Sequence, residues 1–184
     1  MNKKVKIVYV DLDGVLFNFI KGFSQVYDQD YSNLKKRNMA KHIGVTDEEW
    51  QGMLNMLGHD FWANLDLLPK AKQLIELIEK YKLKLYFASS PSDNPGSWSG
   101  KKAAIDTHFP KYSKRLILIK DKFRLASQDT LLIDDAEYQT KNFFRKGGWT
   151  ICYPKQYNFN RKYVGTELEH IESFLTFHSE PYYE

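Results

Sequence analysis

Short apolar segments alternate along this chain with longer segments in which apolar residues recur at helical spacing. This alternation is typical of α/β proteins, in which helices connect the strands of a largely parallel sheet. The run Val5–Val10 is almost continuously apolar, as expected of a central strand that is covered on both faces. We therefore predict an α/β fold built on a parallel sheet, and 184 residues are enough to bury its core.

The other predicted elements follow the first strand in regular order. Further strands are expected at Leu83–Ala88, Arg115–Ile119, Leu131–Ile133 and Thr150–Tyr153. Helices are expected at Phe17–Tyr27, Lys70–Tyr81, Lys101–His108, Glu137–Lys146 and about Glu167–Phe177. Strands and helices thus alternate over most of the chain.

Residues 28–68 interrupt the alternation, because this segment contains no convincing strand. Thr46 and Glu49 have the spacing of a capping box, which predicts a helix that runs on to Leu57. Pro69 marks the return to the alternating pattern. We predict an α/β core domain from residues 1–27 and 69–184, and a small helical insert from residues 28–68.

The composition limits the class of protein but says little about its activity. Cys152 is the single cysteine, which excludes an internal disulfide and favours a reducing compartment. No apolar stretch is long enough to span a bilayer, so we expect a cytoplasmic location and no membrane partner. The net charge of +4 suits a small anionic substrate as well as nucleic acid, so charge alone does not decide.

The first predicted strand runs directly into Asp11-Leu-Asp13-Gly14. Residues two apart in an extended chain point the same way, so both carboxylates project past the end of the strand. Ligands of open α/β sheets bind at this edge. Two carboxylates that close repel each other unless a cation lies between them, and a hard divalent ion such as Mg²⁺ meets that need.

Three other predicted strands also end in polar residues. In chain order, these are Ser89 and Ser90, then Lys120 and Lys122, and then Asp134 and Asp135. Serine hydroxyls and lysine ammonium groups can bind phosphate oxygens, although each segment alone is also typical of an ordinary loop. A hydrophobic core does not require polar residues at four strand ends, which here are an acid pair, a hydroxyl, a lysine and a second acid pair. Together they predict a site for phosphate and a metal ion.

In this order, the four segments resemble the motifs of haloacid dehalogenase-type phosphatases. Within that superfamily the chain is most similar to the 5'(3')-deoxyribonucleotidase family. The matching segments are Asp11–Phe19, Phe61-Trp62-Ala-Asn-Leu, the Ser-Ser-Pro that starts at Ser89, Lys-Asp-Lys122 and Leu-Leu-Ile-Asp-Asp135. The resemblance implies a Rossmann-like sheet with helices on both faces and a small helical cap. It also implies a magnesium-dependent phosphatase that acts on deoxyribonucleoside monophosphates.

The resemblance gives each motif residue a role that agrees with its chemistry. Asp11 is expected to attack phosphorus and to form an aspartyl-phosphate. Asp13 is expected to protonate the leaving oxygen and later to deprotonate the attacking water. Ser89 and Lys122 are expected to hold the phosphate oxygens. The expected ligands of Mg²⁺ are Asp11, the backbone carbonyl of Asp13, and Asp135 as the direct ligand with Asp134 behind it.

Substrate selection requires residues outside these motifs, because the motifs contact only phosphate. The family places aromatic residues beside the nucleobase, and Phe19, Phe61 and Trp62 stand at those positions. The alternative is that these aromatics belong to the core. By resemblance, Ser90, Lys101 and Lys102 are further phosphate or sugar contacts, although one of the two lysines is more typical of a solvated helix start.

Three other functions remain open at this point. One is a phosphatase of polynucleotide ends, although scattered lysines argue against a continuous basic groove. Another is a phosphatase of sugar phosphates or another small metabolite. A third is a catalytically inactive module that binds nucleotide, against which the complete motif set argues. Base preference, 5' versus 3' preference and a homodimer are left open.

Overall fold

Five parallel strands form one sheet in the computed structural model, which describes residues 4–31, 33–34 and 38–183. The strands are β1 (Ile7–Val10), β2 (Lys84–Ser89), β3 (Leu116–Leu118), β4 (Thr130–Asp134) and β5 (Trp149–Cys152). Their order across the sheet is β3-β2-β1-β4-β5. The chain therefore builds the sheet from β1 toward one edge and then returns to the other side of β1. Each predicted strand is present, and none of its ends is shifted by more than two residues.

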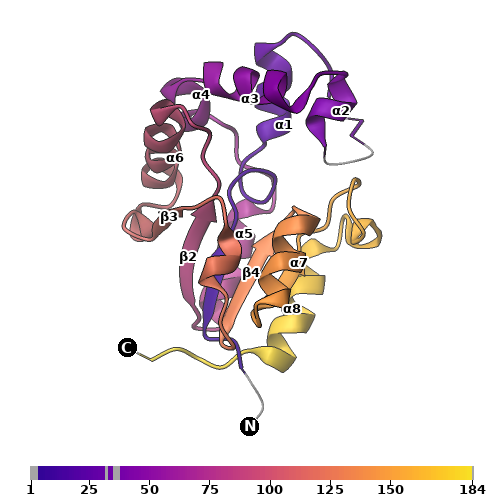
Figure 1. Cartoon of the computed structure of the whole chain (residues 1–184). Coiled ribbons are helices and arrows are strands. Elements are labelled where there is room, and N and C mark those ends of the chain that lie inside the picture. Colours follow the sequence, from indigo (N-terminus) through magenta and orange to yellow (C-terminus); the bar gives the residue numbers. More distant parts are fainter. Residues whose placement is uncertain (1–3, 32, 35–37, 184) are drawn as a thin grey trace.

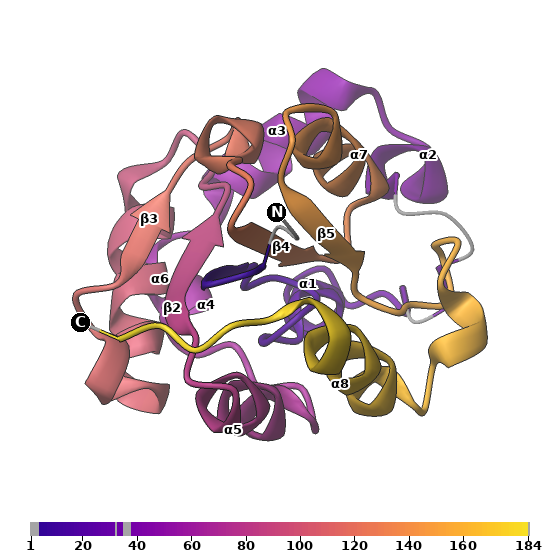
Figure 2. The ribbon, with the colours of Figure 1, turned by 90° about the horizontal axis from the view of Figure 1, so that it is seen from below.

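Helices cover both faces of this sheet. Helices α5 (Ala71–Lys80) and α8 (Glu167–His178) lie on one face, and α7 (Glu137–Arg145) lies on the other (Figure 2). Their inward side chains are fully buried, including Leu74, Ile171 and Phe143 at 0% exposure. The α/β fold class with helices on both faces is confirmed.

Four helices lie beyond the carboxyl ends of the strands (Figure 1). They are α1 (Phe19–Val26), α2 (Met39–Ile43), α3 (Asp47–Met56) and α4 (His59–Ala63). The predicted capping box is present, because the Thr46 hydroxyl accepts from the Glu49 amide and the Glu49 carboxylate accepts from the Thr46 amide. The division into a core domain and an insert at residues 28–68 stays a prediction. Residues 1–3, 32, 35–37 and 184 of that division lie outside the described residues.

Helix α6 (Pro95–His108) begins six residues before the predicted start at Lys101. The Asn94 side chain accepts a hydrogen bond of 2.7 Å from the amide of Gly96 and caps the helix. Pro95 occupies the first position, where its missing N–H leaves no bond unmade. The prolines, serines and glycines before Lys101 are typical of a loop, so the sequence did not predict a helix there. The Asn94 cap and Pro95 nevertheless start the helix at this point. α6 thereby reaches the helices above the sheet.

Short 3-10 helices complete the described chain at Pro110–Tyr112, Lys122–Leu125 and Arg161–Tyr163. Lys122 begins the second of these, after the short loop that follows β3. Among the described residues, no helix has the length and apolar character needed to cross a bilayer.

Candidate active site

The strand register brings the two acid pairs together. Val10 at the end of β1 pairs with Ile133 of β4, and the amide of Asp11 donates 2.9 Å to the carbonyl of Ile133. Asp11 and Asp134 therefore leave neighbouring strands at the same level. This is also where the strand order reverses, the usual position of a ligand site in an open α/β sheet.

Three buried carboxylates form a cluster at this edge. Asp11, Asp134 and Asp135 each offer an oxygen, and these oxygens all lie within 4.8 Å of one another. The Lys122 ammonium lies 2.6 Å from an oxygen of Asp11 and 2.6 Å from an oxygen of Asp134. Lys122 itself is 2% exposed. Residues from distant parts of the sequence thus meet in one buried charged site.

The charges in this cluster perturb one another strongly. Burial, followed by the nearby Asp134 carboxylate, raises the pKa of Asp11 to about 7, although Lys122 acts in the opposite direction. For Lys122, burial favours the neutral amine, but Asp11 and Asp134 outweigh it and hold the pKa above its usual value. The lysine therefore stays charged while Asp11 resists ionisation. A further cation beside Asp11 would relieve that resistance.

The donor set suits a divalent cation. The cluster and its immediate surroundings contain the four carboxylates of Asp11, Asp13, Asp134 and Asp135 and the two ammonium groups of Lys101 and Lys122. The formal charge of this group is therefore −2. Gly14 has φ of +84°, and a Cβ there would lie 2.7 Å from an oxygen of Asp135. The glycine thus keeps the space beside this carboxylate clear. Carboxylate oxygens at this spacing are the ligands that Mg²⁺ prefers, so the geometry supports the predicted metal.

The two acids after β4 differ in their partners. One oxygen of Asp134 accepts from Lys122 and the other accepts 2.8 Å from the amide of Ala136. Asp135 accepts a hydrogen bond from the hydroxyl of Tyr157 through one oxygen. Asp134 is thus committed to orienting Lys122 and the following turn.

The side chain of Asp13 is not one of the three clustered carboxylates, although it lines the same small cavity. It forms an ion pair with the ammonium of Lys101, which also donates 3.0 Å to the hydroxyl of Ser89. Lys101 comes from α6 and is 2% exposed, whereas the side chain of Asp13 is 22% exposed. Lys101 thus connects two residues that the motifs had assigned to the phosphate site.

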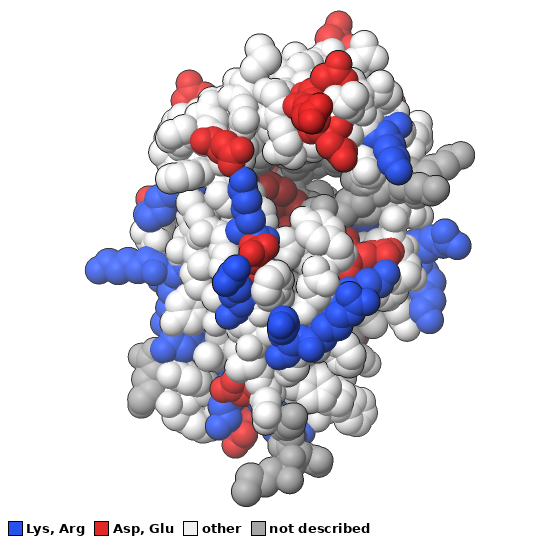
Figure 3. Space-filling view, in the orientation of Figure 1, with Lys and Arg blue, Asp and Glu red and all other residues white. Residues whose placement is uncertain are grey.

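Two connected cavities lie between the sheet and the upper helices, and Figure 3 shows the hollow with acidic side chains inside it. The smaller, of about 70 Å³, is lined by Asp11, Asp13, Ser90, Lys122, Asp134, Tyr138 and Gln139. The larger, of about 750 Å³, extends under α1 and α3. Asp13, Ser90 and Tyr138 line both, so they stand where the two cavities meet.

The comparisons with known proteins agree with this geometry. A family model described as "5' nucleotidase, deoxy (Pyrimidine), cytosolic type C protein" matches residues 5–170. The chain belongs to this family. The resemblance to the deoxyribonucleotidases is therefore confirmed, and the chain is a phosphatase of the 5'-nucleotidase type. No curated protein sequence matches the chain significantly.

Solved structures show the same fold in remote relatives. A haloacid dehalogenase family hydrolase from Deinococcus radiodurans R1 has a TM-score of 0.57 at 11% identity, covering 96% of this chain and 97% of that one. A dehalogenase has a TM-score of 0.56 at 11% identity, covering 95% and 99%. A hydrolase from Entamoeba histolytica has a TM-score of 0.51 at 11% identity, covering 94% and 98%. These likenesses confirm the haloacid dehalogenase-like fold.

Aromatic side chains form one wall of the large cavity of this nucleotidase. Phe19, Trp50 and Trp62 line it, and the rings of Phe19 and Trp62 are stacked with centroids 5.6 Å apart. The two rings contact each other, so a planar ligand cannot enter between them. Trp62 is 4% exposed and the ammonium of Lys101 lies over its ring, so the partly buried Phe19 offers the more accessible aromatic face. Phe61 does not line the cavity and packs edge-on against Trp62 at 4.9 Å. It supports the wall from behind.

Several residues of the site were not predicted from the sequence. Trp50 and Ser92 line the large cavity, and Tyr157 lines it while donating to Asp135. The Asn158 side chain donates 3.1 Å to the backbone carbonyl of Asp135. The rule that ligands bind beyond strand ends would have drawn attention to the loop after β5, which carries Tyr157 and Asn158. Nothing in the sequence around Trp50 separates a cavity wall from a core position.

Proposed function

We propose that this chain hydrolyses deoxyribonucleoside monophosphates through an aspartyl-phosphate on Asp11. The observation that carries the proposal is a buried nucleophile, held by Lys122, at the end of a cavity with an aromatic wall. The small cavity has the charge to take the phosphate, and the large one has the surface to take a nucleoside. The two share Asp13, Ser90 and Tyr138 as lining residues.

In the first half of the reaction, a carboxylate oxygen of Asp11 attacks phosphorus. Lys122 holds one oxygen of Asp11 at 2.6 Å and so orients this carboxylate for attack. A bond forms between Asp11 and phosphorus as the bond to the ester oxygen breaks. Asp13, at the junction of the cavities, gives its proton to the departing nucleoside oxygen.

In the second half, water clears the intermediate. Asp13 accepts a proton from this water, whose oxygen attacks phosphorus and releases Asp11 with inorganic phosphate. In the free protein the Asp13 side chain is held by Lys101 at the junction of the two cavities. Lys122 offsets negative charge that develops on the transferring phosphoryl group.

The metal in this proposal is Mg²⁺. Asp11, Asp135 and the backbone carbonyl of Asp13 would hold it, with Asp134 orienting Lys122. When bound, the ion offsets the repulsion between the carboxylate nucleophile and the anionic phosphate. The raised pKa of Asp11 supports this assignment, because the site lacks enough positive charge of its own.

The large cavity supports a nucleoside as leaving group. A nucleobase that stacks on Phe19, with Trp62 packed behind that ring, would gain roughly 1–3 kcal/mol. Ser90 and Lys101 are proposed contacts at the phosphate or sugar. The family description names deoxynucleotides and pyrimidines for its members, which agrees with this choice. A sugar phosphate would leave the aromatic wall without a flat partner.

Phosphate release from a substrate panel tests the proposal. The panel contains dTMP, dUMP, 3'-monophosphates, ribonucleotides, sugar phosphates and a 3'-phosphorylated oligonucleotide, each with Mg²⁺ and with EDTA. We expect deoxyribonucleoside monophosphates to be hydrolysed best, and only with the metal. Hydrolysis of the oligonucleotide alone would refute the substrate class, and full activity in EDTA would refute the metal's role.

A further inference from the structure

One side chain of α7 connects three segments of the phosphate site. Gln139 is 4% exposed and lines the small cavity, which also contains Asp11 and Lys122. Its side-chain nitrogen donates 2.9 Å to the backbone carbonyl of Lys120 and lies 3.5 Å from the hydroxyl of Ser90. This buried amide takes no part in the two proposed half-reactions, although it lies among the groups that surround the nucleophile.

The orientation of the Gln139 amide follows from its partner. A backbone carbonyl only accepts hydrogen bonds, so the atom 2.9 Å from the carbonyl of Lys120 must be the amide nitrogen. The same nitrogen lies 3.3 Å from the hydroxyl of Tyr138. Gln139 is therefore a donor to the backbone at Lys120, and a side chain of the same length without an N–H would remove this hydrogen bond.

The carbonyl of Lys120 belongs to the loop that carries Lys122. The end of β2 holds this loop from one side, because the amide of Ile119 donates 2.9 Å to the carbonyl of Ser89 and the hydroxyl of Ser90 donates 3.2 Å to the carbonyl of Ile119. The amide from α7 holds it from the other side. The backbone that leads into Lys122 is thus fixed between two elements of the sheet layer.

The position of Lys122 depends on this backbone. Lys122 comes two residues after Lys120 and begins the short helix that follows the loop. Its ammonium lies 2.6 Å from an oxygen of Asp11 and 2.6 Å from an oxygen of Asp134. Both contacts are short, so a shift of the backbone at Lys122 would lengthen at least one of them. A displacement of about 1 Å in an active site can lower a rate about 100-fold.

We infer that Gln139 is a positioning residue, which fixes the loop after β3 and so keeps the ammonium of Lys122 in place against Asp11. The inference rests on the proposed function, in which Lys122 orients the nucleophile and offsets charge on the phosphoryl group. Gln139 lines the small cavity but not the large one, so its effect should be the same for every leaving group.

Gln139→Met keeps the length of the side chain and removes the donor. In Mg²⁺, we expect kcat/KM to fall by about 10- to 100-fold relative to wild type, and by the same factor for dTMP and p-nitrophenyl phosphate. Orthovanadate mimics the transferring phosphoryl group, so its inhibition constant should rise by a similar factor. Gln73→Met, at an exposed position of α5, is the matched control and should change neither value.

The inhibition constant for orthovanadate separates positioning from a structural role. Loss of a buried hydrogen bond is expected to lower the melting temperature in either case, and a smaller folded fraction lowers the apparent kcat. The inhibition constant does not depend on how much of the enzyme is folded. A lower melting temperature with an unchanged inhibition constant would overturn the inference.

A double-mutant cycle with Lys122→Met shows whether Gln139 acts through Lys122. If it does, adding Gln139→Met to Lys122→Met should change the residual kcat/KM for p-nitrophenyl phosphate by less than about 2-fold, because no ammonium is left to displace. Effects of the two substitutions that multiply would overturn the inference.

Three outcomes distinguish the inference from the proposed function. If Lys122→Met is impaired and Gln139→Met is not, the role of Gln139 is refuted and the proposed function stands. If Lys122→Met keeps the wild-type kcat/KM, the role of Gln139 and the proposed role of Lys122 are refuted together. If the wild-type enzyme hydrolyses p-nitrophenyl phosphate but not dTMP, the proposed substrate class is refuted, and p-nitrophenyl phosphate still decides the role of Gln139.

Discussion

The ammonium group of Lys101 lies 4.3 Å from the centre of the Trp62 ring. The same ammonium forms an ion pair with Asp13 and donates to the hydroxyl of Ser89. A desolvated cation over an aromatic face is worth up to about 2 kcal/mol. One side chain of α6 therefore connects the wall of the large cavity with the acid at its junction with the small one.

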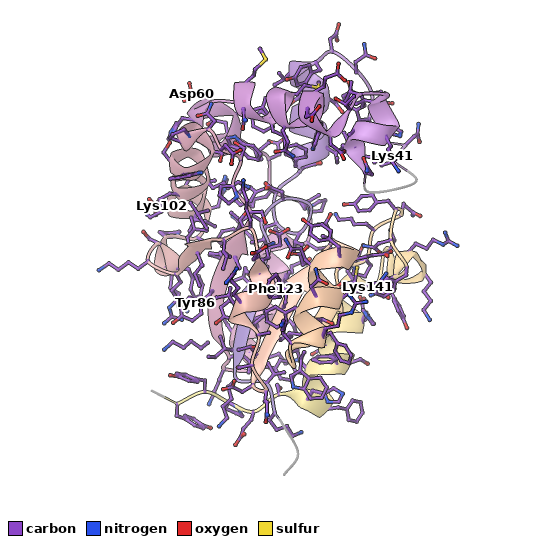
Figure 4. The ribbon with its side chains drawn as sticks, viewed as in Figure 1. Lys41, Asp60, Tyr86, Lys102, Phe123 and Lys141 are labelled. Atoms are coloured by element: carbon purple, nitrogen blue, oxygen red, sulfur yellow. The ribbon has the colours of Figure 1, made fainter. Side chains whose placement is uncertain are left out.

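Lys101→Met keeps most of the length of this side chain but removes its charge. We expect kcat to fall by about 10- to 100-fold for both dTMP and p-nitrophenyl phosphate, because Asp13 loses the partner that orients it. Steady-state kinetics measure the effect. The neighbouring Lys102 pairs with Asp106 on the outer side of α6, marked in Figure 4, so Lys102→Met should behave as wild type. A Lys101→Met enzyme with unchanged kcat would contradict the positioning role.

Asp11→Asn should abolish turnover and preserve the fold. The change removes the attacking oxygen but almost no volume, so we expect phosphate release to fall by at least about 1,000-fold. Near-ultraviolet circular dichroism checks the fold. The matched control is Asp60→Asn at an exposed position of α4 (Figure 4), which should keep full activity. Near-wild-type turnover by a folded Asp11→Asn protein would refute the mechanism.

The raised pKa of Asp11 predicts how stability depends on pH without metal. The folded protein holds this proton up to about pH 7, whereas the unfolded chain releases it near 3.8. Folded molecules thus bind more protons across that window, and the contribution of Asp11 to the free energy of unfolding falls as pH rises through it. Urea unfolding in EDTA measures the slope, and Asp11→Asn should remove this contribution. A variant with the wild-type slope would contradict the assignment.

Tyr157→Phe tests the support of the metal ligand. The variant loses only the hydroxyl that donates to Asp135, so the carboxylate becomes less well oriented. Losses of this kind weaken metal affinity by about 10- to 100-fold, and we expect the Mg²⁺ concentration for half-maximal rate to rise accordingly. Saturating Mg²⁺ should restore most of the rate. Tyr163→Phe, whose ring stacks on His170 away from the site, is the control. An unchanged Mg²⁺ requirement would argue against the role of Tyr157.

Gly100→Ala should disturb the large cavity more than the phosphate site. A Cβ at Gly100 would lie 2.4 Å from the carbonyl of His59 and 2.7 Å from the Cβ of Trp62, so α4 must shift. We expect KM for dTMP to rise several-fold, with a smaller change for p-nitrophenyl phosphate and a loss of about 1–3 kcal/mol in stability.

Gly52→Ala is the control for this substitution. Gly52 lies inside α3, and a Cβ there meets nothing within 4 Å. The control should gain about 0.5–1 kcal/mol in stability with unchanged KM. If Gly100→Ala left both KM and stability unchanged, the close packing of α4 on α6 would not matter for the substrate.

The strands and the motif residues could be predicted because their signals are local. A strand buried on both faces is a largely apolar run, as in β4, and the residues after it must lie at the edge of the sheet. The acids of β1 and β4 were therefore predictable as neighbours. The family resemblance was based on the number and the order of these motif residues.

The rest depends on contacts between distant segments, which no local pattern reveals. Tyr157 reaches Asp135 only because the chain turns back after β5. Phe61 and Trp62 are adjacent aromatics, yet one lines the cavity and the other supports it. The early start of α6 depends on a proline and an asparagine that are equally common in turns. The positions of these residues followed only from their packing.

The pairing of β1 with β4 also affects when activity can appear during synthesis. A ribosome makes Asp11 well before Lys122 and the Asp134–Asp135 pair, which leave the exit tunnel much later. Until then, the nascent chain carries its nucleophile without the charges that orient it. Enzymatic turnover in a translation reaction would therefore report that the fourth strand has docked.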